Sequence, residues 1–321
     1  MSAAWRRNLA QALILVMLLA LPWVVDAYTI STASKILTFG LVAVAVNVLT
    51  GFTGLPHLGM AAYFGVGAYT GAIVAIQVTA TGPVQLVAAA LAGAVTAVAT
   101  GSLAVRARGV PFLMITLAIG EIAHHAAQAL DSITHGTDGL RGIPRVVPLP
   151  GMAELKLDGL VFYYVLAMFL IVLGLVAVVM RSPFGHTLGG IRDNEARMRA
   201  IGYPTDWYVL AGYTFAGAVA GAAGSLWTTT QRFVAPGDLG FEISALALLA
   251  VVLGGVRSLW GSVLGMALVV IARDYIGPDL GGHSPLLLGL LFVVAVYLLP
   301  RGLAGIRRRR AVKPTPEEVT G

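Results

Sequence analysis

The sequence predicts an all-α, polytopic integral membrane protein: one helical bundle with about ten transmembrane or re-entrant segments. Apolar residues make up 58% of the 321-residue chain and charged residues only 11%, so most of it cannot present a surface to water. The 39 glycines suit the close helix approach through which bilayer helices pack. Lys and Arg gather at the ends of apolar runs rather than on a stripe interleaved with aromatics, which argues against nucleic acid as a partner.

Ten apolar runs approach the length of about 20 residues that a helix needs to cross a bilayer. The first could instead be a secretory signal, because Arg6 and Arg7 precede it and a small-residue cleavage site could follow it. The gap at Arg257 and Ser258 could belong to a kinked or re-entrant segment rather than to a loop between two spans. The runs occupy residues 9–25, 33–50, 55–78, 84–105, 110–130, 160–180, 208–231, 243–256, 259–275 and 286–299.

The distribution of basic residues predicts the orientation of the chain. Ten crossings place both termini on one side, together with 15 of the 21 Lys and Arg residues, so the positive-inside rule predicts cytoplasmic termini. Residues 131–159 are then an external loop, and residues 181–207 a charged cytoplasmic loop. We expect residues 1–306 to form a single transmembrane domain and residues 307–321 a basic, disordered cytoplasmic tail.

Motifs for catalysis are missing from the sequence. It holds no G-x-x-x-x-G-K-[ST] loop, so the chain cannot hydrolyse ATP through a P-loop of its own. Glu121 and His124 form a Glu-x-x-His pair, but a di-iron site needs a second copy and zinc needs H-E-x-x-H. Interfacial or core histidines are therefore the better interpretation. With no cysteine available either, we expect no catalytic residue, no metal site and no cofactor in this chain.

Two features inside the apolar runs are candidates for a translocation pathway. Glu121 lies near the middle of its run, where an ionisable group suggests function, and we expect it to face the bundle interior. The alternative is a carboxyl that hydrogen-bonds across helices. Three glycines and a proline in residues 51–59 predict a discontinuous helix whose free backbone groups could line a path for a zwitterion. The candidate pathway residues are Gly54, Pro56, His57, Gly59, Tyr63 and Glu121.

Three G-x-x-x-G pairs favour close helix packing over contact with a solute. They are Gly67 with Gly71, Gly217 with Gly221, and Gly261 with Gly265.

The loop at residues 181–207 is too charged and too long for a simple helix connection, so we expect a partner to dock there. A short helix is expected at residues 191–200, ended by Gly202. Asp193 and Glu195 would point in different directions on it, so one could contact the partner while the other supports the helix near its N-terminus. A solvated connector is the alternative.

The most specific sequence block is Ser182-Pro-Phe-Gly185 with Ile191-Arg-Asp-Asn-Glu195 and Ala200-Ile-Gly202. Further blocks follow in order at residues 54–69, 108–122, 136–144, 216–224, 251–265 and 300–303. Together they resemble the permeases of bacterial branched-chain amino acid importers of the ATP-binding-cassette class, specifically the LivM type of the two paired permeases. The sequence departs from that pattern at His135, usually Gly, at His186, usually Arg, and at Gly189-Gly190.

The resemblance implies a transport subunit, not an enzyme, in the bacterial cytoplasmic (inner) membrane. An external solute-binding protein would deliver a branched-chain amino acid or similar small polar solute, and this chain with a sister permease would form the pathway. Two cytoplasmic ATPase subunits would bind ATP and Mg. Contacts with the ATPases are expected at Ile191, Arg192, Asp193, Asn194, Glu195 and Gly202, and contacts with the binding protein at Thr137, Asp138, Gly139 and Arg141.

The alternative is an ion-coupled secondary carrier or channel for a small polar solute. Such a protein would couple an ion gradient through carboxylates inside the membrane. Glu121 is the one carboxylate that the sequence places deep in a predicted span, which is little for ion coupling.

Overall fold

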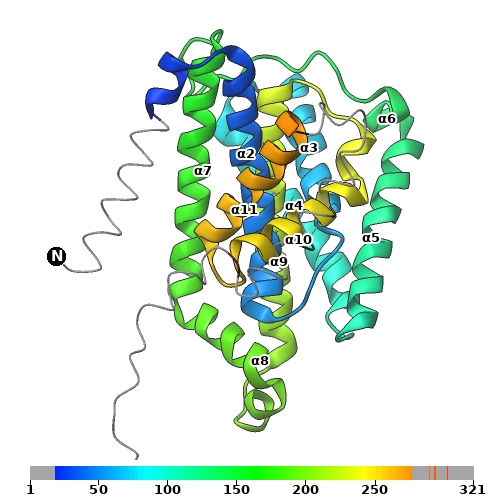
Figure 1. Cartoon of the computed structure of the whole chain (residues 1–321). Helices are drawn as coiled ribbons and strands as arrows, with labels where there is room; N and C mark the ends of the chain where they lie inside the picture. The colour runs from blue at the N-terminus through cyan, green and yellow to red at the C-terminus, as the bar shows by residue number, and fades with distance from the viewer. Residues whose placement is uncertain (1–18, 277–288, 290–292, 294–301, 303–321) are drawn as a thin grey trace, which may run out of the picture.

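A computed structural model describes residues 19–276 and the single positions Gly289, Val293 and Gly302 (Figure 1). Every regular element within these residues is a helix, and six helices are long and apolar enough to cross a membrane. The predicted all-α, multi-pass fold is thus confirmed. The first expected span, 9–25, is described only from Leu19 onward. The last, 286–299, lies outside the described residues apart from two positions, and the basic tail at 307–321 lies wholly outside them.

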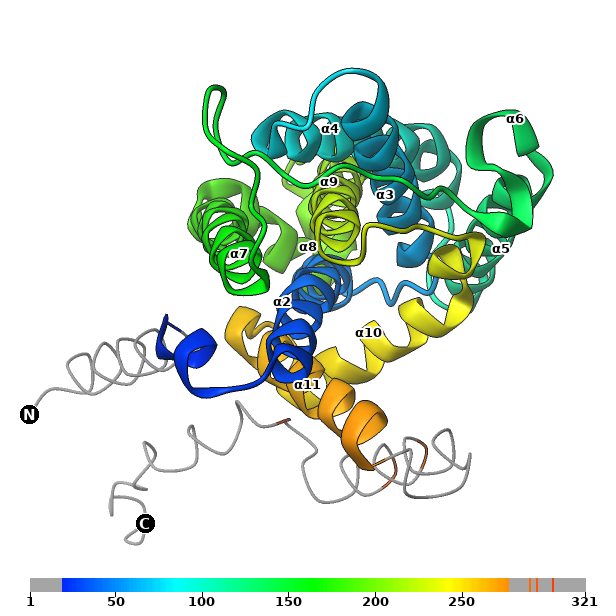
Figure 2. The ribbon, with the colours of Figure 1, turned by 90° about the horizontal axis from the view of Figure 1, so that it is seen from above.

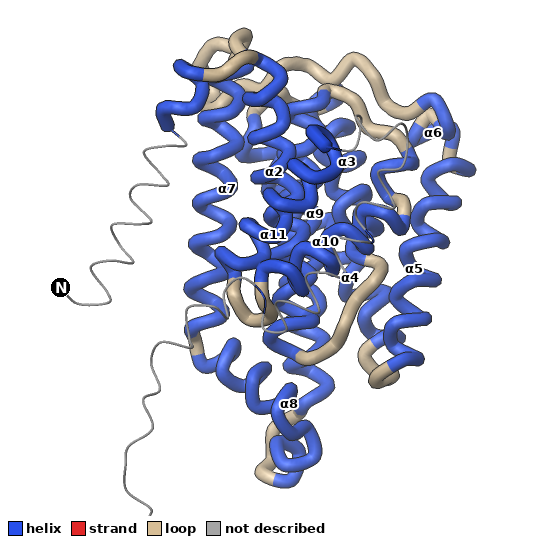
Figure 3. The backbone as a smooth tube through the Cα atoms, in the orientation of Figure 1, coloured by secondary structure: helices blue, strands red, loops and turns tan. Residues whose placement is uncertain are grey.

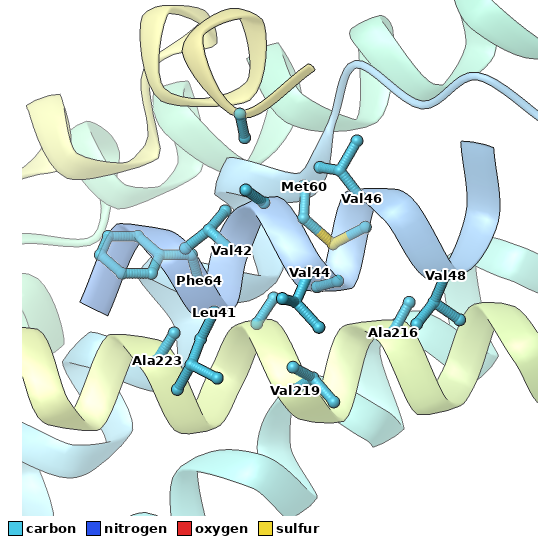
Figure 4. Packing of buried hydrophobic residues seen from close by; sticks show 14 of the residues in the cluster. Leu41, Val42, Val44, Val46, Val48, Met60, Phe64, Ala216, Val219 and Ala223 are labelled. Carbon is cyan, nitrogen blue, oxygen red and sulfur yellow. The ribbon is translucent and has the colours of Figure 1, made fainter. Parts of the chain in front are cut away.

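Two helices occupy the centre of the bundle. They are α2 (Ala27–Asn47) and α9 (Thr205–Gln231). In the most apolar stretch of each, 83% of the residues are buried for the segment that contains α2 and 72% for α9. Leu41 and Val44 of α2 lie against Val219 and Ala223 of α9 in a wholly apolar contact (Figure 4). These two helices are the scaffold on which the others pack.

The remaining spans surround this pair (Figure 2). They are α3 (Met60–Gln77), α4 (Gly82–Ala104), α5 (Val110–Ala129) and α7 (Asp158–Arg181). Only 22% of the residues in the most apolar stretch of α4 and of α5 are buried, so both helices lie at the edge of the chain. The large exposed side chains of α4 are all apolar, as a lipid-facing surface requires. They are Val84, Val87, Leu91, Val95, Val98 and Leu103.

Glycine lets α3, α4 and α9 approach backbone to backbone. A Cβ added at Gly67 would stand 2.2 Å from the carbonyl oxygen of Gly221, and one at Gly217 would stand 2.8 Å from the carbonyl oxygen of Gly93. In the third predicted pair, a Cβ added at Gly261 would stand 2.3 Å from the carbonyl oxygen of Gly254. The prediction that the G-x-x-x-G pairs serve helix packing is therefore confirmed.

The break predicted at residues 51–59 is present. The helix of α2 continues as the π-helix η1 (Val48–Thr53), residues 54–59 are not helical, and α3 begins at Met60, five residues later than the predicted span (Figure 3). Gly54 ends η1 with a φ of 79°, a left-handed conformation that suits glycine. α3 is thus a separate span of 18 residues that begins after this interruption.

A second interruption separates α10 (Phe241–Gly254) from α11 (Leu259–Ile271), which meet at a bend of 119°. A π-helical turn, η4 (Ala272–Ile276), follows α11. Arg273 of η4 forms an ion pair of 2.9 Å with Glu242 at the start of α10, so the outer ends of the pair meet. α10 and α11 therefore form a hairpin with its tip at residues 255–258. This is the kinked or re-entrant arrangement that the gap at Arg257 and Ser258 predicted.

Short elements complete the two ends of the bundle. At the end where α2 begins lie α6 (Asp131–Thr134), η2 (Gly136–Asp138) and η3 (Pro236–Leu239). At the other end, α8 (Pro183–Ala200) connects α7 to α9 and projects beyond the spans (Figure 1). Proline in the first turn starts both α5 and α8, where its missing N–H costs no helical hydrogen bond.

We predict that Gly221→Leu destabilises the protein by at least about 1–3 kcal/mol, because the added side chain would meet the carbonyl oxygen of Ala89 2.3 Å from its Cβ. The thermal unfolding temperature of the detergent-solubilised protein measures this loss. Gly174→Leu on α7 is the matched control, since its Cβ would meet nothing within 4 Å. Equal unfolding temperatures for the two variants would contradict the packing role.

Candidate functional site

The helix break is held by a buried chain of hydrogen bonds. His57 is fully buried, its Nδ1 accepts from the Gly59 N–H at 3.2 Å, and its Nε2 lies 3.0 Å from the Tyr213 hydroxyl. Because Nδ1 is an acceptor, the network assigns the proton to Nε2, which donates to Tyr213. The Tyr213 hydroxyl lies 2.7 Å from that of Tyr63, which lies 2.7 Å from Thr100 Oγ1. A single donor direction therefore runs from the break into α9, α3 and α4.

This chain changes the interpretation of two predicted pathway residues. His57 and Tyr63 lie together, as predicted, but their polar atoms are occupied by Tyr213 and Thr100. An unsatisfied polar group at such depth would cost several kcal/mol, so these bonds hold the end of the break in place. Whether either side chain also meets a solute remains a prediction.

The other residues of the break lie against neighbouring helices. Gly54 contacts α8, since a Cβ there would stand 2.7 Å from Arg192 Cγ. Pro56 is half-buried. Gly59 meets α5, since a Cβ there would stand 2.0 Å from the carbonyl oxygen of Thr116. The break thus joins α8 at one end to α5 at the other.

Glu121 lies on α5 but points away from this core. Its side chain is 44% exposed, and its nearest ionic partner is His125, at 4.0 Å and 71% exposed. The expectation that Glu121 faces the interior is therefore wrong for this chain on its own, because α5 stands at the edge of the bundle. His124 instead bonds inward: its Nδ1 lies 2.8 Å from the carbonyl oxygen of Pro236.

The described residues hold no group of three or more His, Asp and Glu side chains arranged to bind a metal ion.

The predicted binding-protein loop is folded onto the end of the bundle. Thr137 and Asp138 are exposed on η2. Gly139 is buried with a φ of 68°, beside the bridge that pairs Leu140 with Val234. The guanidinium of Arg141 lies over the ring of Phe233, 5.5 Å from its centroid. His135, where a glycine was expected from the family pattern, has a φ of 58°.

At the opposite end, α8 consists of two helices joined at Asn194, whose φ of −162° and ψ of 94° are not helical. The Asn194 side chain accepts from the Arg197 N–H at 2.9 Å, so it caps the second helix. At the far end the Gly202 N–H donates to the carbonyl oxygen of Arg199, and the Tyr203 N–H donates to that of Met198. This pair of hydrogen bonds is the Schellman motif that ends many helices. The prediction that Gly202 ends the helix is confirmed.

Glu195, the first residue after this kink, is the centre of an ionic network. Its carboxylate receives two parallel hydrogen bonds from Arg108, of 2.8 and 2.9 Å, and a third of 3.0 Å from Arg199. Arg108 belongs to the loop between α4 and α5, and it also bonds Asp206 of α9 at 3.1 Å. A forked pair of this kind fixes orientation as well as distance. Glu195 therefore holds α8 to two other parts of the chain.

The network shifts the ionisation of both partners. Hydrogen bonding to Arg108 is the largest influence on Glu195 and holds the pKa of its carboxyl below the ordinary 4.5, against partial burial that acts in the opposite direction. Hydrogen bonding to Glu195 raises the pKa of the Arg108 guanidinium above its ordinary value. The pair is therefore fully ionised at neutral pH.

The remaining predicted residues of α8 differ in exposure. Ile191 is buried in the core, whereas Arg192 is exposed, with its guanidinium donating to the carbonyl oxygen of Gly51. Asp193 is also exposed, as are Arg197 and Arg199 beyond the kink. Of the division expected between Asp193 and Glu195, the supporting role falls to Glu195. Contact of the exposed Asp193 with a partner stays a prediction.

Three residues that organise these sites were not singled out from the sequence. Tyr213 closes the hydrogen-bond chain, Arg108 anchors Glu195, and Asn47 at the end of α2 is fully buried with three hydrogen bonds. A polar side chain inside an apolar run was a usable signal for Tyr213 and Asn47. Arg108 had none, because basic residues between spans are expected for topology alone.

We predict that the attachment of α8 depends on pH through Glu195. Because its folded pKa is lowered, its contribution to stability is present above the ordinary value of 4.5 and is lost as the pH falls through the folded pKa. As the pH falls below 4.5, an environment-sensitive label on Arg197→Cys should therefore report release of α8. Glu195→Gln should cost about 1 kcal/mol at neutral pH and abolish this transition, whereas Glu154→Gln in the external loop should preserve it. An unchanged transition in Glu195→Gln would contradict the assignment.

Comparison with known proteins agrees with this architecture. The family described as branched-chain amino acid transport system / permease component matches residues 28–298. The chain is 28% identical to the high-affinity branched-chain amino acid transport system permease protein LivM of Escherichia coli strain K12, over 94% of this chain and 76% of that protein.

The LivM protein of Salmonella typhimurium is also 28% identical, over 92% of this chain and 74% of its own length. A probable branched-chain amino acid transport permease protein LivH of Methanocaldococcus jannaschii is 28% identical over 79% of this chain and 84% of its own length. No solved structure matches the chain. The chain belongs to the permease-component family of branched-chain amino acid transport systems.

Proposed function

We propose that this chain is a permease subunit of an ATP-driven importer of the inner membrane. It forms half of the pathway for a branched-chain amino acid or a similar small polar solute, together with a sister permease. An external binding protein delivers the solute, and two cytoplasmic ATPase subunits, which bind ATP and Mg, supply the energy. The relatives named for branched-chain amino acid transport support the substrate class.

The observation that carries this proposal is the form of α8. It projects from one end of the bundle, and its exposed surface carries Asp193, Arg197 and Arg199 (Figure 1). Glu195 ties its second half to the loop before α5 and to the start of α9, so force applied at the exposed surface is passed to the spans rather than lost in a flexible loop. A projecting helix with fixed attachments suits docking to a motor subunit.

The exposed face of α5 supports a second permease as partner. Glu121 and His125 stand on this face, and an ionisable pair that faced lipid would be costly. A water-filled pathway or the surface of another chain removes that cost. The outer face of α4, by contrast, presents only apolar large side chains and suits lipid. We therefore place the pathway along α5, with Glu121 in its wall.

The orientation follows from the two ends of the bundle. Arg108, Arg192, Arg197 and Arg257 gather at the end that carries α8, which the positive-inside rule assigns to the cytoplasm together with both termini. The loop with Thr137, Asp138, Gly139 and Arg141 then faces the binding protein.

The carrier alternative would need free carboxylates along the spans. Asp274 is held by Lys35 at 2.6 Å and Glu242 by Arg273 at 2.9 Å, whereas Glu121 has the weak partner His125 at 4.0 Å. Uptake driven by an ion gradient without ATP would favour that alternative.

We predict that Asp193→Lys abolishes ATPase docking and lowers ATP-driven uptake at least about tenfold, a change of roughly 1.4 kcal/mol, because it reverses a charge on the exposed docking surface. The measurement reconstitutes the permease pair, ATPases and binding protein in vesicles and follows ATPase association, hydrolysis and uptake. Glu195 is unsuitable for this test, because its substitution would also release α8.

Glu154→Lys, an equal charge reversal in the external loop, is the control that should leave association unchanged. Single-cysteine labelling fixes the orientation of the same vesicles: Thr137→Cys should react only from outside and Arg197→Cys only from the ATPase side. Normal association and solute-stimulated hydrolysis in Asp193→Lys would refute the docking role.

We predict that Glu121→Leu lowers uptake at least about tenfold while ATPase association stays normal, because the substitution removes a polar group from the pathway wall without touching α8. Met114→Leu, on an exposed position of the same helix, is the control and should transport normally. Uptake that is unchanged in Glu121→Leu would remove this residue from the pathway.

A further inference from the structure

Asn47 lies at the C-terminal end of α2, where the helix changes to η1, and its whole side chain is used for hydrogen bonds to the α10–α11 hairpin. Its Nδ2 donates to the carbonyl oxygen of Ser258 at 3.1 Å and to Ser262 Oγ at 2.7 Å. Its Oδ1 accepts from the Arg257 N–H at 3.0 Å. One fully buried amide therefore holds the tip of the hairpin and the first turn of α11.

The backbone that Asn47 holds is unusual. Arg257 has a φ of 70°, a left-handed conformation that non-glycine residues rarely adopt and keep only where their surroundings fix it. The Asn47 carboxamide supplies one such constraint by accepting the Arg257 N–H. The tip of the hairpin therefore depends on α2 for its shape.

The π-helix η1, which follows Asn47, is also held by α8. The Arg192 guanidinium donates to the carbonyl oxygen of Gly51, one helical turn beyond Asn47. Gly51 leaves no room for a side chain, since a Cβ there would stand 1.8 Å from Asn47 Oδ1 and 2.9 Å from the Arg257 nitrogen. α8, η1 and the hairpin tip therefore meet within a few ångströms.

α8 also contacts the hairpin tip directly. A Cβ at Gly189 of α8 would stand 3.3 Å from Nη2 of Arg257, so the hairpin tip also lies against α8 itself. Gly189 is one of the two glycines by which α8 departs from the family pattern, and a larger residue there would crowd Arg257.

The hairpin has a second attachment on the far side of the break. The Ala61 N–H, in the first turn of α3, donates to Ser244 Oγ of α10 at 2.9 Å. α10 and α11 therefore bridge the non-helical residues 54–59, with Asn47 on the α2 side and Ala61 on the α3 side. A movement of the hairpin tip would change the distance between the end of α2 and the start of α3.

We propose that Asn47 and Arg192 are positioning residues that carry a movement of α8 into the membrane interior. Arg192 fixes α8 to η1, and Asn47 fixes η1 to the hairpin tip, so the three move as one body and shift the break between α2 and α3. This inference rests on the proposed docking function of α8. It adds a route by which docking reaches the spans.

The experiment compares solute transported per ATP hydrolysed in vesicles that contain the complete transporter. Asn47→Ala and Arg192→Gln should each lower this ratio at least about fivefold, the lower end of typical coupling between sites, while ATPase association and hydrolysis persist. Ser262→Ala, which removes one of the three partners of Asn47, should have a smaller effect. Arg192→Lys should restore part of the ratio, because it keeps a donor toward Gly51.

A spectroscopic measurement tests the link even if Asn47→Ala folds poorly. The sequence contains no cysteine, so spin labels can be placed at Arg197→Cys on α8, Val256→Cys at the tip and Leu103→Cys on α4. On ATP binding the distance between the α8 and tip labels should stay constant, while both move relative to α4. Adding Arg192→Gln should leave the movement of α8 intact and let the tip lag behind it.

The outcomes separate this link from the proposed function. If α8 does not move relative to α4 when ATP binds, the docking function fails. If α8 moves but the hairpin tip does not follow it in the protein with native Asn47 and Arg192, the proposed link is wrong while the docking function stands. A loss of ATPase association in Arg192→Gln would also overturn the link, because Arg192 would then be a docking residue. Normal transport per ATP in Asn47→Ala and in Arg192→Gln would exclude both residues as carriers of the movement.

Discussion

The structure depends on one constraint: a polar group inside the bilayer must find its partner within the protein, because lipid offers none. The break between α2 and α3 frees backbone groups inside the bundle, and several backbone groups at or beside the break are met by particular side chains. The Gly59 N–H reaches His57, the Ala61 N–H reaches Ser244, and the carbonyl of Gly51 reaches Arg192. Ser244 belongs to α10 and Arg192 to α8, so satisfying these groups also ties other helices to the break.

The same constraint distinguishes the two edge helices. α4 and α5 have the same buried share and both expose large apolar side chains, but α5 also presents Glu121 and His125. A lipid-facing helix tolerates exposed apolar side chains, but an ionisable pair that faces lipid is costly. The bundle is thus polarised before any partner is considered, with one side suited to lipid and another suited to water or protein.

Rigidity is distributed in a way that suits transport. The centre, α2 against α9, is packed with apolar residues and has little freedom, and glycine contacts fix α3 and α4 against α9. The interruptions at residues 54–59 and 255–258 lie outside this fixed block and are held by hydrogen bonds as well as by packing. Hydrogen bonds can exchange between two arrangements more readily than a close-packed core can repack. Movement is therefore expected at the interruptions, next to α8.

The sequence by itself determined the class of fold, most spans, the break at Pro56 and the end of α8 at Gly202, because each follows from local rules of hydropathy, turn residues and helix capping. It also indicated that Asp193 and Glu195 would have different tasks. Only the tertiary structure decided that Glu195 is the residue that supports the helix, because that depends on Arg108, 87 positions earlier in the chain. Distance in sequence likewise hid the contact of Asn47 with Ser258, 211 positions away, and local rules wrongly placed Glu121 inside this chain. Hydropathy predicts that a helix spans the membrane, but the direction in which its polar residue points is set by how the helices pack.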